Sequence, residues 1–144
     1  MVDLQKCGNT RGDIPGRPAG QGLTILIVDD NPDMRAYVRH CLNYLGNQGA
    51  QLLEAADGLE ALKLARRVSP DLVISDIVMP QLDGYELCKA LKALPDARHS
   101  KILLISGETD NERIREAGAD AFLGKPFNAE RMRASLDALL KAAQ

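Results

Sequence analysis

The sequence predicts an α/β domain built on a doubly wound parallel sheet. Short segments rich in Val, Ile and Leu alternate along the chain with segments whose apolar residues recur at helical spacing. The short segments are continuously apolar, which is typical of strands that helices bury on both faces. A length of 144 residues with 45% hydrophobic residues is sufficient for one such domain with its own core.

Five strands are expected, each a short apolar run that ends at polar residues or glycine. They are residues 23–28 (LTILIV), 50–55 (AQLLEA), 71–75 (DLVIS), 101–106 (KILLIS) and 121–123 (AFL). Because helical segments separate these runs, successive strands are expected to lie parallel in one sheet.

The first helical segment follows the first strand, and its apolar residues recur at intervals of three and four. They are Met34, Val38, Cys41, Leu42 and Leu45. Asn31 suits the N-cap position, and Pro32 follows in the first turn, where proline is tolerated. Residues 43–51 (NYLGNQGAQ) are expected to lengthen a surface loop before the second strand.

Four further helical segments complete the alternation of strands and helices. They cover residues 58–67, 84–94, 111–118 and 128–143. The third of these four is short, and Gly118 suits the position just after a helix, where the left-handed conformation is common.

Residues 1–22 are rich in glycine and contain two prolines, and they show almost no apolar periodicity. Such a composition predicts a flexible tail or linker, because it offers too little apolar surface to offset the entropy lost on ordering. The domain itself is therefore expected at residues 23–144.

The composition excludes several classes of protein. Eighteen basic and twenty acidic residues give a net charge of −2, and no basic cluster is dense enough to bind nucleic acid. No apolar run reaches the roughly 18 residues of a membrane span, and no signal peptide is apparent, so we expect a cytoplasmic protein without a membrane partner. The three cysteines lack the spacing of a zinc site, and Cys41 and Cys88 are expected to be packing residues.

Polar side chains lie at the ends of four predicted strands. Asp29 and Asp30 follow the first strand, Asp76 follows the third, Ser106 ends the fourth and Lys125 follows the fifth. A single Asp after a strand is ordinary turn chemistry. Because the carboxyl ends of parallel strands meet at one edge of the sheet, where ligands bind in such folds, we expect all five side chains to converge on one crevice.

Three carboxylates in one crevice repel one another, and a single ammonium balances only one of them. The site is therefore expected to attract a divalent cation. Oxygen ligands with open coordination positions favour Mg²⁺, and the lack of nearby Cys or His disfavours zinc. A magnesium site beside an amine, a hydroxyl and a free carboxylate suits phosphoryl transfer in which one Asp attacks the phosphorus.

Four motifs resemble the receiver domain of two-component response regulators. They are ILIVDDN (25–31), PDLVISDIVMPQLDGYEL (70–87), LLISGE (103–108) and GADAFLGKPF (118–127). The resemblance covers about residues 23–142. It implies a flavodoxin-like (βα)5 domain of the chemotaxis-regulator type, with five strands in the order 2-1-3-4-5.

The resemblance also implies a phosphoacceptor and a metal site. Asp76 would accept a phosphoryl group from a sensor histidine kinase or a phosphotransfer protein, which makes the chain a signalling module rather than an enzyme. Asp29, Asp30 and Asp76, together with the backbone carbonyl of Val78, would hold the magnesium ion.

The remaining motif residues are assigned to the response by the same resemblance. Lys125 would contact a phosphoryl oxygen, Ser106 would be the switch hydroxyl and Phe122 the switch aromatic. The Lys125–Pro126 peptide bond would be cis. Residues 107–124 separate Ser106 from Lys125, fewer than in many receivers, which leaves little room for a long fourth helix.

Several functions remain open at this point. The chain fits a freestanding regulator, the receiver portion of a hybrid sensor kinase, or a module of the same fold that binds partners without phosphorylation. A magnesium-dependent phosphatase with an Asp nucleophile is disfavoured, because Val78 stands where that chemistry needs a second acid. The downstream target is open, and a homodimer remains a candidate assembly.

Overall fold

One parallel sheet of five strands organises the part of the chain that the computed structural model describes, which is residues 22–46, 49–95, 97, 99–107 and 111–142. The strands are β1 (Thr24–Val28), β2 (Gln51–Ala55), β3 (Leu72–Asp76), β4 (Lys101–Ser106) and β5 (Ala121–Gly124). All neighbouring strands are parallel, and their order is β2-β1-β3-β4-β5. The predicted fold class and strand order are confirmed.

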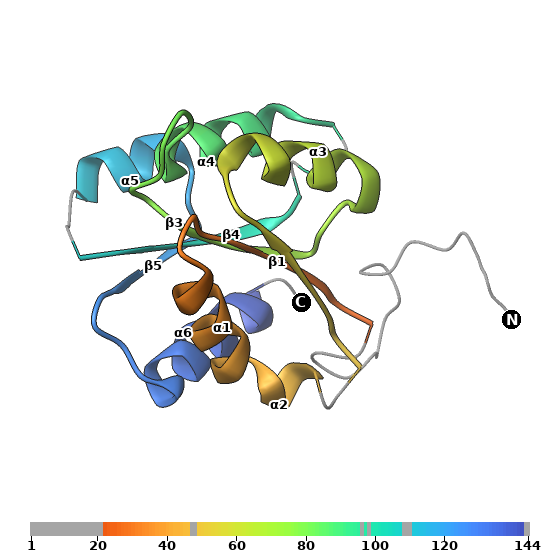
Figure 1. Cartoon of the computed structure of the whole chain (residues 1–144), viewed down its shortest axis with the longest axis vertical. Coiled ribbons are helices and arrows are strands. Elements are labelled where there is room, and N and C mark those ends of the chain that lie inside the picture. Colours follow the sequence, from red (N-terminus) through yellow and green to blue (C-terminus); the bar gives the residue numbers. More distant parts are fainter. Residues whose placement is uncertain (1–21, 47–48, 96, 98, 108–110, 143–144) are drawn as a thin grey trace, which may run out of the picture.

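Helices cover both faces of the sheet. Within the described residues they are α1 (Pro32–Cys41), α2 (Asn43–Gly46), α3 (Gly58–Val68), α4 (Gly84–Ala93), α5 (Asn111–Ala117) and α6 (Ala129–Ala142). Figure 1 shows α1, α2 and α6 on one face and α3, α4 and α5 on the other. The result is a three-layer sandwich, and α5 is as short as the sequence predicts.

Each face of the sheet has its own apolar core, because successive residues of a strand point to opposite faces. Leu26 and Val28 of β1 pack in the cluster beneath α3, α4 and α5, whereas Ile25 and Ile27 pack in the cluster beneath α1 and α6. All five residues of β1 are buried. This burial on both faces explains why the strand sequences are continuously apolar.

Helix α1 begins at the predicted cap. The Asn31 side chain accepts hydrogen bonds from the backbone N–H of Asp33 at 2.8 Å and of Met34 at 3.4 Å. Pro32 occupies the first turn, where its missing N–H costs no hydrogen bond. The helix therefore starts one residue after the acidic pair that follows β1, with the cap Asn31 between them.

The prediction for the end of the first helix was wrong. The apolar spacing placed Leu45 on one continuous helix and residues 43–51 in a loop, but α1 ends at Cys41 and Asn43–Gly46 forms the short helix α2. Leu42 lies between them with φ −97° and ψ 3°. Leu42 and Leu45 are both buried in the cluster beneath α1 and α6, so two helices joined by a bend satisfy the apolar pattern as well as one.

Three other predictions concern the N-terminal tail, the cysteines and membrane-spanning helices. The tail predicted at residues 1–22 lies outside the described residues, apart from Gly22, and stays a prediction. Cys41 and Cys88 are buried and not bonded to each other, as expected of packing residues. None of the helices in the described ranges combines the length and the apolar character that a membrane span requires.

Candidate functional site

Three carboxylates meet at the carboxyl edge of the sheet. Asp29 and Asp30 follow β1, and Asp76 is the last residue of the neighbouring strand β3. One oxygen from each of the three carboxylates lies within 4.8 Å of the other two. The structure thus brings these three predicted residues together, in an arrangement that can hold a metal ion.

The three carboxylates differ in their exposure. Asp29 is 4% exposed and Asp76 is 8% exposed, whereas Asp30 lies on the surface. Asp29 Oδ1 accepts the N–H of Asn31 at 2.8 Å, and Asp76 Oδ1 accepts the N–H of Ile77 at 2.8 Å. Each buried carboxylate is therefore oriented by the backbone of a residue that closely follows it in the chain.

Burial has a marked effect on Asp29. Desolvation raises the pKa of its carboxyl group from 3.8 to about 6, and the negative charges of Asp76 and Asp30 contribute to the rise. The hydrogen bond from Asn31 and the charge of Lys125 lower this pKa but only partly compensate. The site therefore carries electrostatic strain that a cation at the three oxygens would relieve.

Lys125 and Ser106 complete the predicted set at the same edge. Lys125 Nζ lies 3.3 Å from Asp76 Oδ1, and the lysine side chain is 28% exposed. The Lys125 backbone N–H donates to the carbonyl oxygen of Ser106 at 2.9 Å. Ser106 is buried at the end of β4, where it is in register with Gly124 of β5. The amine thus lies beside one of the carboxylates, and Ser106 ends β4, the strand next to the one that ends with Asp76.

The loop after Asp76 is held against the site by Gly84, the first residue of α4. The Gly84 N–H donates to the Ile77 carbonyl oxygen at 2.8 Å. A Cβ at this position would clash with the Asp76 carbonyl oxygen and lie 2.7 Å from the Ile77 Cα. Asp83 and Glu86 form a reciprocal capping box with bonds of 2.8 and 2.9 Å, which fixes the start of α4. Glycine is therefore required here by close packing on the backbone of β3.

Val78 and Phe122 occupy different environments from the acids. Val78 lies in the loop after β3 with a side chain that is 64% exposed. Phe122 is partly buried on β5, paired with Leu104 of β4, and packs against the core beneath α3, α4 and α5. The aromatic ring thus belongs to the layer that contains α5. The Lys125–Pro126 peptide bond is cis, as the resemblance implied.

The sequence analysis missed two side chains of α1, one that bonds to the backbone of Asp29 and one that bonds to the loop after Lys125. Arg35 Nη1 donates to the Asp29 carbonyl oxygen at 2.6 Å, and its Nε forms an ion pair with Glu54 Oε1 of β2 at 3.0 Å. Tyr37 Oη donates to the carbonyl oxygen of Phe127 at 2.7 Å. Helical periodicity is a pattern of apolar positions, so it carries no signal for these long-range polar contacts.

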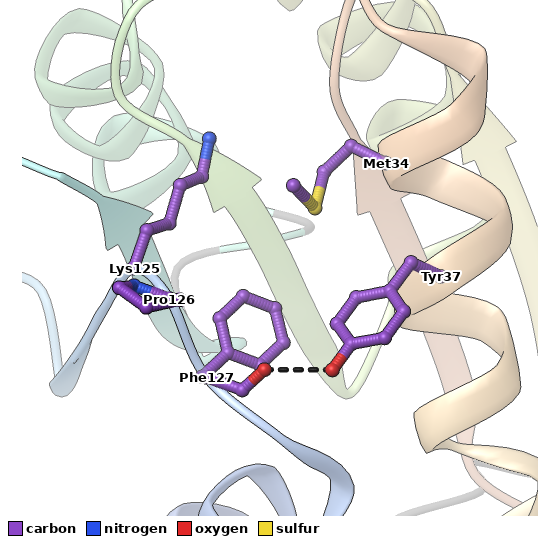
Figure 2. A pocket seen from close by; sticks show the side chains of 5 residues that line it. All are labelled: Met34, Tyr37, Lys125, Pro126 and Phe127. Atoms are coloured by element: carbon purple, nitrogen blue, oxygen red, sulfur yellow. Dashed lines mark hydrogen bonds between the residues drawn. The ribbon is translucent and has the colours of Figure 1, made fainter.

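A pocket of about 490 Å³ opens between α1 and the loop that follows β5 (Figure 2). Its lining is mostly apolar, and Lys125 contributes the one charged side chain among the residues that form it. These residues are Met34, Tyr37, Lys125, Pro126 and Phe127. The pocket therefore lies directly beside the lysine of the acidic site.

The chain matches a known protein family and is similar in sequence to two of its relatives. The family described as "Response regulator receiver domain" matches residues 25–137. The chemotaxis protein CheY-3 of Vibrio cholerae is 36% identical over 124 residues, which are 84% of this chain and 94% of that protein. Histidine kinase P4 of Formosa agariphila is 35% identical over 121 residues, which are 82% of this chain but only 8% of the kinase.

Solved structures show the same fold. The receiver domain of a sensor histidine kinase from Pseudomonas aeruginosa aligns with a TM-score of 0.73 and 28% identity. The alignment covers 83% of this chain and 98% of that one, and the solved structure has a magnesium ion coordinated in its active site cleft.

Proposed function

We propose that this chain is a signalling module switched by phosphorylation of Asp76. The chain belongs to the response regulator receiver domain family. The phosphoryl donor is the phosphohistidine of a sensor histidine kinase or of a phosphotransfer protein. The observation that carries the proposal is the cluster of three carboxylates within 4.8 Å, with Lys125 Nζ 3.3 Å from one of them. A packed domain has no structural need for this concentration of like charge.

Magnesium is the metal that the donor set fits. Carboxylate oxygens on one open side of the site, together with the backbone carbonyl of Val78, suit a hard cation that keeps several coordination positions free. Asp29, Asp30 and Asp76 would hold this ion, and the magnesium in the related Pseudomonas receiver supports the assignment. When bound, the ion supplies positive charge to the oxygens of an incoming phosphoryl group.

The transfer step uses the side chains at the strand ends. A carboxylate oxygen of Asp76 attacks the phosphorus, and an acyl phosphate forms as the bond between phosphorus and the donor's imidazole nitrogen breaks. The electron pair of that bond stays on the imidazole, which takes up a proton. Lys125 contacts a phosphoryl oxygen and balances charge that would otherwise repel the donor.

Phosphorylation then changes the surface near α5. The phosphoryl group adds negative charge and acceptor oxygens at the end of β3, and the Ser106 hydroxyl on the neighbouring strand is the donor that turns toward them. Phe122 packs in the layer that contains α5, so a movement of Ser106 can be passed through β4 and β5 to that layer. The partner that binds the changed surface is a protein rather than a nucleic acid.

The length of the relatives leaves the wider context open. The chain spans most of a chemotaxis protein but a small part of a histidine kinase. A freestanding regulator and the receiver portion of a hybrid kinase therefore both fit, in either case at a cytoplasmic location, and a homodimer remains a candidate assembly. The complete set of site residues disfavours a module that works without phosphorylation.

Intact-mass measurement after incubation with Mg²⁺ and acetyl phosphate tests the proposal. The wild type is expected to gain one phosphoryl mass, and chelation of the metal or Asp76→Asn is expected to prevent the gain. Asp33→Asn is the matched control, since Asp33 lies in the first turn of α1 outside the carboxylate cluster. Equal labelling of Asp76→Asn and the wild type would show that another residue accepts the group.

A further inference from the structure

Tyr37 joins α1 to the loop that carries Lys125. Its hydroxyl donates to the Phe127 carbonyl oxygen at 2.7 Å across 90 residues of sequence. Figure 2 shows this bond and the two aromatic rings side by side, and the ring centroids are 5.4 Å apart with an interplanar angle of 51°. Phe127 is itself buried in the core beneath α1 and α6. The contact therefore anchors the loop two residues after the lysine.

The other anchor of this loop is the backbone of Lys125 itself. The lysine N–H donates to the Ser106 carbonyl oxygen at 2.9 Å, which ties the loop to the end of β4. Between these two points the Lys125 side chain forms part of the wall of the 490 Å³ pocket. Its aliphatic stem has open space on that side, so packing there does little to fix the ammonium. The ammonium is therefore placed by the Lys125 backbone together with its 3.3 Å contact with Asp76 Oδ1.

We propose that Tyr37 is a positioning residue for phosphoryl transfer, because its bond to Phe127 holds the loop that places Lys125 Nζ beside Asp76. The hydroxyl touches none of the reacting atoms and acts through the lysine. The inference rests on the proposed function, because the ammonium needs this placement only if Asp76 accepts a phosphoryl group.

Tyr37→Phe separates the hydrogen bond from the ring packing. The phenyl ring retains its contact with Phe127, but the carbonyl oxygen of Phe127 loses its donor. A net hydrogen bond of ordinary strength corresponds to a change of about three- to tenfold in a rate or equilibrium. We expect phosphoryl uptake from acetyl phosphate to slow by this factor.

Tyr44→Phe is the matched control. Tyr44 belongs to α2 in the same layer, and its buried hydroxyl has no hydrogen-bond partner among the described residues. Arg133 stacks over its ring at 4.5 Å, a contact that phenylalanine can also make. The substitution removes the same atom from a tyrosine of the same helical layer without touching the Lys125 loop, so wild-type uptake is expected.

A double-mutant cycle decides whether Tyr37 acts through Lys125. In the Lys125→Ala background, Tyr37→Phe is expected to cause no further loss of rate. If the two substitutions instead multiply, Tyr37 contributes to the fold in general and the proposed positioning role is wrong. Urea unfolding of each variant reports any difference in stability.

An NMR measurement tests the positioning without any phosphoryl transfer. Asp76→Asn should shift the Lys125 Cε signal, because a neighbouring charge disappears. This response is expected to shrink in Tyr37→Phe and to remain in Tyr44→Phe. If the Lys125 Cε response shrinks in Tyr37→Phe while the wild type accepts no phosphoryl group, Tyr37 positions Lys125 but the proposed function fails. If the wild type is labelled and Tyr37→Phe keeps both its rate and this response, the positioning role is wrong and the function stands.

Discussion

Replacing Asp29 with Asn should stabilise the protein when magnesium is absent. Burial raises the pKa of this carboxyl group to about 6 in the folded state, whereas its ordinary value, which the unfolded chain takes, is 3.8. A raised pKa means that the folded state disfavours the ionised form. The fold therefore bears the full cost of ionised Asp29 above about pH 6 and loses that cost as the pH falls toward about 4, below which the group is protonated in both states.

The magnitude follows from the size of this difference. Each pKa unit corresponds to about 1.4 kcal/mol, so two units set an upper value near 3 kcal/mol. We expect Asp29→Asn to raise the free energy of unfolding by about 1–3 kcal/mol at about pH 7.5. The Asn oxygen can still accept the N–H of Asn31, so the local hydrogen bond is retained.

Urea unfolding in the presence of a chelator, followed by circular dichroism, measures the effect. The free energy of unfolding of Asp29→Asn should exceed that of the wild type most at about pH 7.5. The two values should be close to each other at about pH 4. Asp33→Asn serves as the control and should change stability by less than about 0.5 kcal/mol, in the destabilising direction, because it removes an acid from the first turn of α1. The reasoning is refuted if Asp29→Asn is no more stable than the wild type at the higher pH.

Three further predictions concern other residues of the site. Asp30→Ala should weaken magnesium binding without loss of the fold, because it removes one exposed oxygen of the cluster, and an unchanged calorimetric titration would contradict this. Gly84→Ala should lower the free energy of unfolding by about 1–3 kcal/mol, because its Cβ would clash with the Asp76 carbonyl; a variant as stable as the wild type in urea would show that the loop adapts. Ser106→Ala should still accept a phosphoryl group but give a smaller chemical-shift change at Phe122 and along α5. If the fully phosphorylated variant shows the wild-type response, the signal does not pass through this hydroxyl.

Much of the fold could be predicted because the sequence of each strand reflects burial on both faces. In β1, alternate residues from Ile25 to Val28 pack in different cores, and only continuously apolar sequence meets that demand. The convergence of Asp29, Asp30 and Asp76 was also predictable. It follows from parallel strands whose carboxyl ends share one edge of the sheet.

Other features could not be predicted because they depend on tertiary contacts. The bend at Leu42 leaves the helical spacing of apolar residues intact, so periodicity alone could not detect it. The contact of Tyr37 with Phe127 joins residues far apart in the chain, and no local pattern pairs Tyr37 with the motif that Phe127 ends. The unequal burial of Asp29 and Asp30 is likewise a property of the fold, because the two residues are identical and adjacent in the sequence.

Direct identification of the phosphorylated residue is the measurement that tests the central claim. Borohydride reduces an acyl phosphate of Asp to homoserine, which tandem mass spectrometry can place in the sequence. After incubation with Mg²⁺ and acetyl phosphate, homoserine is expected at position 76 and should be absent when the metal is chelated. Homoserine at position 29 or 30, or none at any position in a protein that has gained phosphoryl mass, would contradict the assignment of Asp76 as the acceptor.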